Sequence, residues 1–163
     1  MGDDITANLR TVPTVPLELS EGDGDAPEVF EVRGEVFMTR AGFESLNKER
    51  EEAGEERFMN PRNATAGTLK QLDPRMVARR PLRLVGYGLG EVRPAGAVPA
   101  RQSEVLSWLA SLGLKTSERT WLCRSADEVM VALKELDGIR RRFDYETDGG
   151  VIKLNALSLR ARV

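Results

Sequence analysis

The chain has 163 residues, of which 40% are hydrophobic and 31% are charged, and its net charge is −2. This length suits one domain with a packed core, and the balanced charge excludes bulk electrostatic binding of polyanions, so nucleic-acid contacts must come from local patches. The absence of histidine excludes histidine-based catalytic triads and metal sites built from histidine, and a single cysteine excludes an internal disulfide framework. No segment reaches a transmembrane length and no secretory signal is visible, so we expect a cytoplasmic protein.

The N-terminal part is expected to begin with loops and continue into a strand. Residues 1–27 contain prolines and the acidic stretch EGDGDAP, which favour extended and turn structure. Residues 28–38 predict a strand in which Glu31, Arg33 and Glu35 alternate with apolar residues. The charged face is either exposed to solvent or lines a site, and alternation alone favours exposure.

The middle of the chain combines a helix with a stretch rich in turn residues. A helix is expected from about Arg40 to Ala53, with Phe43 and Leu46 on its inner face and Gly54 at its end. The stretch FMNPRNATAGTLKQLDP predicts loops around one short helical turn near residues 64–69.

The remaining elements mix helices and strands without a regular βαβ rhythm. A helix over residues 101–112 ends at Gly113, and another begins at a capping box formed by Ser125 and Glu128. Further strands are expected at 81–90, 115–123 and 148–155. The predicted fold class is therefore α+β, with a mainly antiparallel sheet and flanking helices.

Several cations stand where an anion could bind. Arg62 and Lys70 are expected on a glycine-containing loop, whose small residues would let a phosphate approach the backbone. The run Arg140–Arg142 is either a solvated surface or a contact for a nucleic-acid backbone.

Two residues on predicted strands also point to a ligand. Tyr87 stands between Gly86 and Gly88, which could leave its ring free to stack on a base, although a buried tyrosine at a strand bend is an equal alternative. Lys153 lies among apolar residues of a predicted strand, where its ammonium needs an anion or water, unless it protects a strand edge.

These stretches together resemble a known family. EVRGEVFM, NPRNATAGTLKQLDPR, YGLG and DGGVIKLN, in this order, are similar to the adenylation domain of bacterial NAD-dependent DNA ligases, as is GDDITANLRTVPTVPL near the start. NPRNATAGTLKQLDP is specific to that family, whereas DGGVIK and EVRGE are shared with other covalent nucleotidyltransferases. The resemblance implies that residues 1–163 are a partial adenylation domain with the nucleotidyltransferase fold.

The resemblance also implies a reaction and its partners. In the family, a lysine attacks NAD and releases nicotinamide mononucleotide, the AMP moves to the 5′-phosphate of a DNA nick, and the 3′-hydroxyl then displaces AMP. We therefore expect NAD as the AMP donor, Mg²⁺ as a cofactor and nicked duplex DNA as a partner. We expect no membrane association, no zinc ligands in this chain and a monomer in the full-length enzyme.

The resemblance assigns roles to three pocket residues. Glu35 matches the glutamate that holds the ribose, Tyr87 matches the aromatic residue that stacks on adenine, and Lys153 matches the lysine that contacts the AMP phosphate. Gly150 replaces a residue that is usually valine, which should loosen the last predicted strand.

Three cations match the phosphate and DNA region of the family. They are Arg62, Lys70 and Arg140. Lys70 stands where many members have arginine, so a bidentate contact would become a point charge.

The family's attacking lysine lies in a K-x-D-G motif, and none of the five lysines of this chain stands in that motif. The nearest match, Lys134–Gly138, has one residue too many, and Gly138 is expected to end a helix there. We therefore expect an internal piece of the ligase that supplies the nucleotide pocket without the nucleophile. The alternative is an inactive nucleotide- or DNA-binding relic of the same fold, and NPRNATAGTLKQLDP argues against a relative that uses ATP or GTP.

Overall fold

The computed structural model describes residues 2–20, 27–94 and 96–162. Residues 21–26 of the acidic stretch EGDGDAP lie outside the described residues. The chain divides into two compact units. The first unit comprises Met1–Leu17, Val36–Leu84 and Arg140–Thr147, and the second comprises Glu18–Glu35, Val85–Ile139 and Asp148–Val163.

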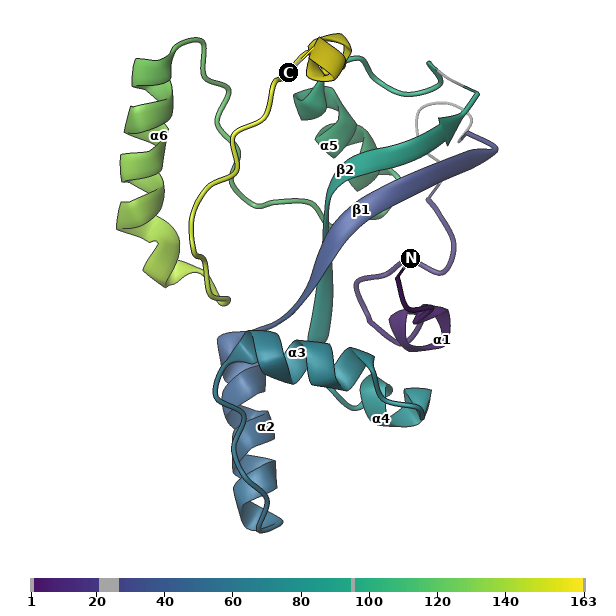
Figure 1. Ribbon diagram of the computed structural model, residues 1–163, viewed down its shortest axis with the longest axis vertical. Coiled ribbons are helices and arrows are strands. Elements are labelled where there is room, and N and C mark those ends of the chain that lie inside the picture. Colours follow the sequence, from purple (N-terminus) through teal and green to yellow (C-terminus); the bar gives the residue numbers. More distant parts are fainter. Residues whose placement is uncertain (1, 21–26, 95, 163) are drawn as a thin grey trace. The chain divides into compact units, whose positions relative to one another are not determined.

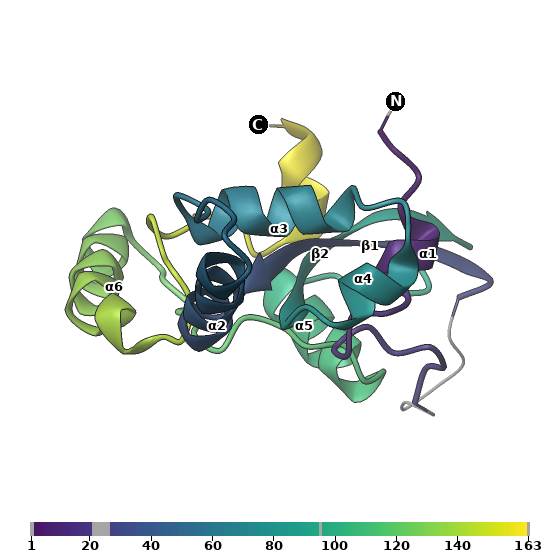
Figure 2. The same ribbon diagram turned by 90° about the horizontal axis from the view of Figure 1, so that it is seen from below.

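The first unit is mainly helical (Figure 1). Its helices are α1 (Thr6–Leu9), α2 (Arg40–Glu52), α3 (Pro61–Leu69) and α4 (Pro74–Ala78), followed by the 3₁₀ turn η1 (Arg140–Arg142). Figure 2 shows α1 beside α4, two helices that are in contact. The buried core of this unit is formed by Val12, Met38, Leu46, Ala64, Val77 and Leu82.

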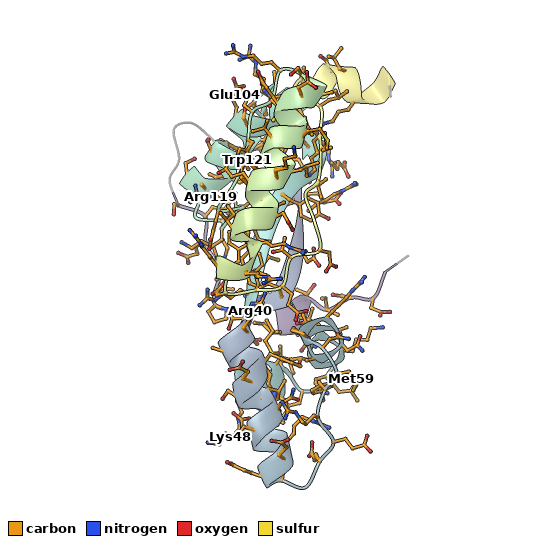
Figure 3. All side chains as sticks on the ribbon, turned by 90° about the vertical axis from the view of Figure 1, so that its left-hand side faces the viewer. Arg40, Lys48, Met59, Glu104, Arg119 and Trp121 are labelled. Carbon is orange, nitrogen blue, oxygen red and sulfur yellow. The ribbon has the colours of Figure 1, made fainter. Side chains whose placement is uncertain are left out.

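The helix expected at residues 40–53 is confirmed as α2. The Thr39 hydroxyl accepts a hydrogen bond from the Gly42 amide at 3.1 Å, which satisfies one of the free N–H groups at the helix start. The chain leaves the helix at Gly54, whose φ of 72° is a left-handed conformation that glycine adopts without steric cost. Figure 3 shows Lys48 on this helix and Met59 in the segment that follows the helix in sequence, and both residues are at the surface.

The expectation of a loop with one helical turn near residues 64–69 is wrong, because α3 is a nine-residue helix. Asn60 caps it by accepting a hydrogen bond from the Asn63 amide at 2.8 Å, and Pro61 occupies the first helical position. These start signals outweigh the low helix propensity of the asparagine, threonine and glycine residues that follow. Ala64 is fully buried in the core, so its small side chain serves packing and not the approach of a ligand.

In the part of the chain that the structure describes, the sheet consists of two strands, β1 (Val29–Met38) and β2 (Leu82–Arg93). The boundary between the two units passes through both strands. Glu31 of β1 lies beside Gly90 of β2, whereas Gly34 lies beside Val85, so the strands are antiparallel. The expected alternation along β1 is confirmed. Its charged residues are exposed and its apolar residues face inward, namely Phe30, Val32, Val36 and Met38.

The second unit contains α5 (Gln102–Ser111), α6 (Ala126–Ile139) and the 3₁₀ segment η2 (Leu157–Arg162) (Figure 1). The helix expected at residues 101–112 is confirmed as α5, and it ends before Gly113, whose φ is 92°. The capping box is confirmed in one of its two bonds, because the Ser125 hydroxyl accepts a hydrogen bond from the Glu128 amide at 3.2 Å. The Glu128 carboxylate accepts its hydrogen bond from the Arg124 amide at 2.6 Å, one residue before the position that a capping box uses. Gly138 does not end α6 as expected, since the helix continues to Ile139. Buried apolar residues of this unit are Val105, Leu109, Leu112, Leu114 and Leu136.

Two of the expected strands are wrong. Residues 115–123 contribute a single parallel bridge between Thr116 and Gly86, and residues 148–154 have no regular structure. The physical reason is that a strand needs a neighbouring backbone to pair with, and within the described residues these segments have no ladder partner. Instead, Gly150 packs on α6, where an added Cβ would lie 3.1 Å from the Leu133 side chain.

Within the described parts of the chain, no helix is long and apolar enough to cross a membrane.

Candidate functional site

The structure brings Tyr87 and Lys153 into direct contact in the second unit. The Lys153 Nζ lies 4.6 Å from the centroid of the Tyr87 ring and donates a hydrogen bond of 2.9 Å to the Tyr87 carbonyl oxygen. An ammonium over an aromatic ring face is attracted by the ring's negative charge distribution. Tyr87 is 43% exposed, which favours the interpretation of an accessible ring over that of a buried one. We call these two residues the Tyr87–Lys153 pair.

Glu35 lies on β1 and Tyr87 on β2, and both residues are exposed. Within the described residues, no hydrogen bond or ion pair links Glu35 to either member of the pair.

The other two charged residues at the centre of β1, Glu31 and Arg33, are engaged with each other. The Glu31 carboxylate accepts a hydrogen bond from the Glu91 amide at 3.2 Å and pairs with Arg33 at 3.3 Å. The hydrogen bond from Glu91, followed by that from Arg33, lowers the pKa of Glu31. Gly90 leaves the space for this carboxylate, because a side chain there would overlap it.

The surroundings of Lys153 change its acidity. Partial burial, followed by the nearby positive charge of Arg160, lowers the pKa of the Lys153 ammonium. The sequence offered no indication of this shift, because Arg160 is not part of the motif. Alternation along the expected strand would turn Ile152 away from Lys153 and into the core, but Ile152 is 68% exposed, while Val36 of β1 is half-buried.

Two polar residues that the sequence did not single out are joined to the pair. The Gln102 side-chain Nε2 donates a hydrogen bond of 2.9 Å to the Tyr87 carbonyl oxygen, the same atom that Lys153 contacts. The Gln102 Oε1 in turn accepts a hydrogen bond from Arg160 at 2.6 Å. A glutamine at the start of a helix has no distinguishing sequence pattern, so only the structure reveals this role.

The three predicted phosphate and DNA contacts lie in the first unit. Arg62 is exposed in the first turn of α3, and Lys70 follows the last turn of the same helix. The Lys70 ammonium pairs with Asp3 at 3.4 Å, with both side chains largely exposed. Arg140 donates a hydrogen bond to the Thr147 carbonyl at 3.4 Å and is half-buried. Arg62 and Lys70 are thus placed at opposite ends of α3, about 12 Å apart along its axis.

Acidic and thiol groups do not assemble into a metal site in residues 2–20, 27–94 and 96–162. This part of the chain holds no group of three or more histidine, cysteine, aspartate or glutamate residues that could bind a metal ion.

Comparison with known proteins places the chain in a family. It matches the NAD-dependent DNA ligase adenylation domain over residues 1–163. It is 51% identical over 162 residues to DNA ligase 1 of Opitutus terrae, which covers 99% of this chain and 24% of that protein. It is 46% identical over 155 residues to a DNA ligase of Methylacidiphilum infernorum, covering 95% of this chain and 22% of that protein.

A DNA ligase of Shouchella clausii is 44% identical over 158 residues, covering 97% of this chain and 22% of that protein. The chain therefore spans roughly a quarter of the length of these curated relatives. The match over all residues and the identity to these relatives agree with the motifs on β1, α3 and β2. The chain belongs to the NAD-dependent DNA ligase adenylation domain family.

Proposed function

We propose that this chain is a partial adenylation domain with the nucleotidyltransferase fold, and that it forms the AMP pocket of an NAD-dependent DNA ligase. NAD is the cosubstrate that donates AMP, and nicked duplex DNA is the partner. The observation that carries the proposal is the Tyr87–Lys153 pair, in which an ammonium lies over an exposed aromatic ring in a chain of this family.

The chemistry of AMP fits these groups. An aromatic ring offers a stacking surface for adenine, and an ammonium can neutralise a phosphate. In the proposed pocket Tyr87 stacks on adenine, Lys153 contacts the phosphate and the exposed Glu35 of β1 accepts a hydrogen bond from the ribose. The lowered pKa of Lys153 comes from burial and from Arg160, and a bound phosphate would oppose it by favouring the charged form.

We further propose that Arg62, Lys70 and Arg140 contact phosphates of the nucleotide or of DNA. Arg62 and Lys70 are exposed, and the Lys70–Asp3 pair is an exposed ion pair that contributes little to stability and can be exchanged for another anion. Although the family resemblance implies magnesium, the described residues offer no clustered ligands for it, so no step is assigned to a metal here.

In the proposed reaction the chain positions AMP but does not attack it. Transfer forms a bond between a lysine nitrogen and the AMP phosphorus and breaks the bond to nicotinamide mononucleotide. None of the five lysines stands in the K-x-D-G motif, so the nucleophile is not assigned to this chain. Lys153 acts on the phosphate charge and on its orientation.

The proposal is tested by calorimetric titration of the chain with AMP and with NAD. We expect Tyr87→Ala to weaken AMP binding by about 1–3 kcal/mol, the usual contribution of stacking one base. Lys153→Met should weaken it as well, whereas the matched change Lys134→Met, at an exposed lysine of α6, should have no effect. Equal affinity for AMP in the wild-type chain and in both pocket variants would refute the proposed pocket.

A further inference from the structure

Gln102 is a buried polar residue with both ends of its amide engaged. It is 8% exposed, its Nε2 donates to the Tyr87 carbonyl oxygen and its Oε1 accepts from Arg160. A buried amide is tolerated when its donors and acceptors have partners, and each partner then fixes the position of the other. Gln102 thus links η2 to β2 through one side chain.

The Tyr87 carbonyl oxygen is the point where this linkage meets Lys153. Gln102 Nε2 and Lys153 Nζ each lie 2.9 Å from that oxygen, so the two nitrogens lie within twice that distance of each other. A carbonyl oxygen has two lone pairs, and here both have a donor. The backbone of Tyr87 and the ammonium of Lys153 are therefore held at a common atom.

Among residues 2–20, 27–94 and 96–162, no strand forms a ladder with the segment that carries Lys153. It is attached instead to the start of α5, where the Asn155 carbonyl and side-chain oxygens accept hydrogen bonds from the Gln102 and Ser103 amides at 2.7 and 3.0 Å. Leu157 adds a backbone hydrogen bond of 2.9 Å to Ala100. The first turn of α5 is consequently the support of Lys153.

We propose that Gln102 is a positioning residue that sets the Lys153 ammonium over the Tyr87 ring and thereby determines how well the pair accepts an adenine nucleotide. Gln102 acts through its hydrogen bonds and does not itself contact the nucleotide. The part of this inference that concerns nucleotide binding rests on the proposed function, whereas the part that concerns the geometry of the pair does not.

The geometry is tested by NMR, because methylene protons held over a ring face resonate upfield. In the wild-type chain we expect an upfield shift of the Lys153 Hε protons that is lost in Tyr87→Ala. Gln102→Met keeps the side-chain volume but removes both hydrogen bonds, and it should reduce that shift while the amide spectrum of the first unit is preserved. Gln102→Glu keeps the acceptor for Arg160 and loses the donor to Tyr87, so it provides a second variant should Gln102→Met fail to fold.

The matched control is Gln71, the other glutamine of the chain, which is exposed on the first unit. Gln71→Met and Gln71→Glu should leave the Lys153 signals unchanged. If a folded Gln102 variant keeps the full upfield shift of Lys153, the positioning role is refuted.

Calorimetry with AMP separates the inference from the proposed function. If Gln102 positions the pair for a nucleotide, folded Gln102 variants should bind AMP about tenfold more weakly than the wild type and the Gln71 controls, which corresponds to about 1.4 kcal/mol. Wild-type affinity in a variant whose Lys153 shift has collapsed would overturn the link to nucleotide binding. Absence of AMP binding in the wild type, with the Lys153 shift still dependent on Gln102, would refute the proposed function and support the positioning role.

Discussion

Asn155 supports the start of α5 from a distant part of the chain, and its replacement by alanine should destabilise the second unit. The residue preceding the helix, Arg101, provides no side-chain cap. The Asn155 Oδ1 accepts the hydrogen bond of the Ser103 amide instead, at 3.0 Å. The neighbouring bond from the Gln102 amide to the Asn155 carbonyl involves only backbone atoms, so Asn155→Ala removes one hydrogen bond and leaves the other.

The magnitude follows from the location of this bond. Replacing a capping asparagine by alanine costs about 0.5–2 kcal/mol of unfolding free energy. Because the Ser103 bond is exposed, water can replace it in the variant, and we expect the lower half of the range, about 1 kcal/mol. A loss of this size corresponds to a Tm lower by about 2–4 °C for a chain of this length.

Tryptophan fluorescence during urea unfolding measures the effect in the appropriate unit. Both tryptophans, Trp108 and Trp121, lie in the second unit, and the ring centroid of Trp108 is 5.3 Å from that of Phe30. Asn63→Ala is the control, because Asn63 is exposed on α3 and alanine is the better helix former, so the midpoint should stay or rise slightly. Equal midpoints for Asn155→Ala and Asn63→Ala would refute the distant cap.

Four further outcomes are expected. Gly90→Ala should displace the Glu31 carboxylate and so return the pKa of Glu31 toward its ordinary value. The free energy of unfolding should change by less than about 0.5 kcal/mol. An NMR titration of Glu31 that is the same in the variant and the wild type would contradict this. The hydrogen bonds from the Arg75 side chain and, second, from the Arg75 amide lower the pKa of Asp73, the residue that caps α4. The stabilisation from this cap is therefore complete above the ordinary aspartate pKa and is lost as the pH falls through the lowered pKa. An NMR titration in which the Arg75 amide signal changes at the ordinary aspartate pKa would contradict this. The isolated chain should form oligomers and unfold with a Tm below about 65 °C. Ile152→Ser should reduce the oligomers seen in size-exclusion chromatography, because Ile152 exposes 68% of its surface and can contact another copy of the chain. Incubation with adenylyl-labelled NAD and Mg²⁺ should add no AMP to the intact mass, and a lysine carrying AMP would show that the nucleophile had been misassigned.

The family, the alternation of β1 and the positions of α2 and α5 could be predicted from the sequence. The alternation of β1 and the ends of α2 and α5 depend on residues within a few positions of each other, such as Gly54 and Gly113, whose φ values of 72° and 92° suit glycine. The motifs also named Tyr87 and Lys153 as candidates, and the structure places them in contact although 66 positions separate them.

The tertiary structure alone decided what these residues touch. Residues 148–154 have an apolar, strand-like sequence, but a strand forms only where a second backbone offers its N–H and C=O groups, and the described chain offers this segment no ladder. Gln102 and Arg160 lie 58 positions apart, and their hydrogen bond forms because α5 and η2 meet in the second unit. A side-chain hydrogen bond requires two groups within about 3 Å of each other, and for distant residues it is the fold, not the local pattern, that brings them to that distance.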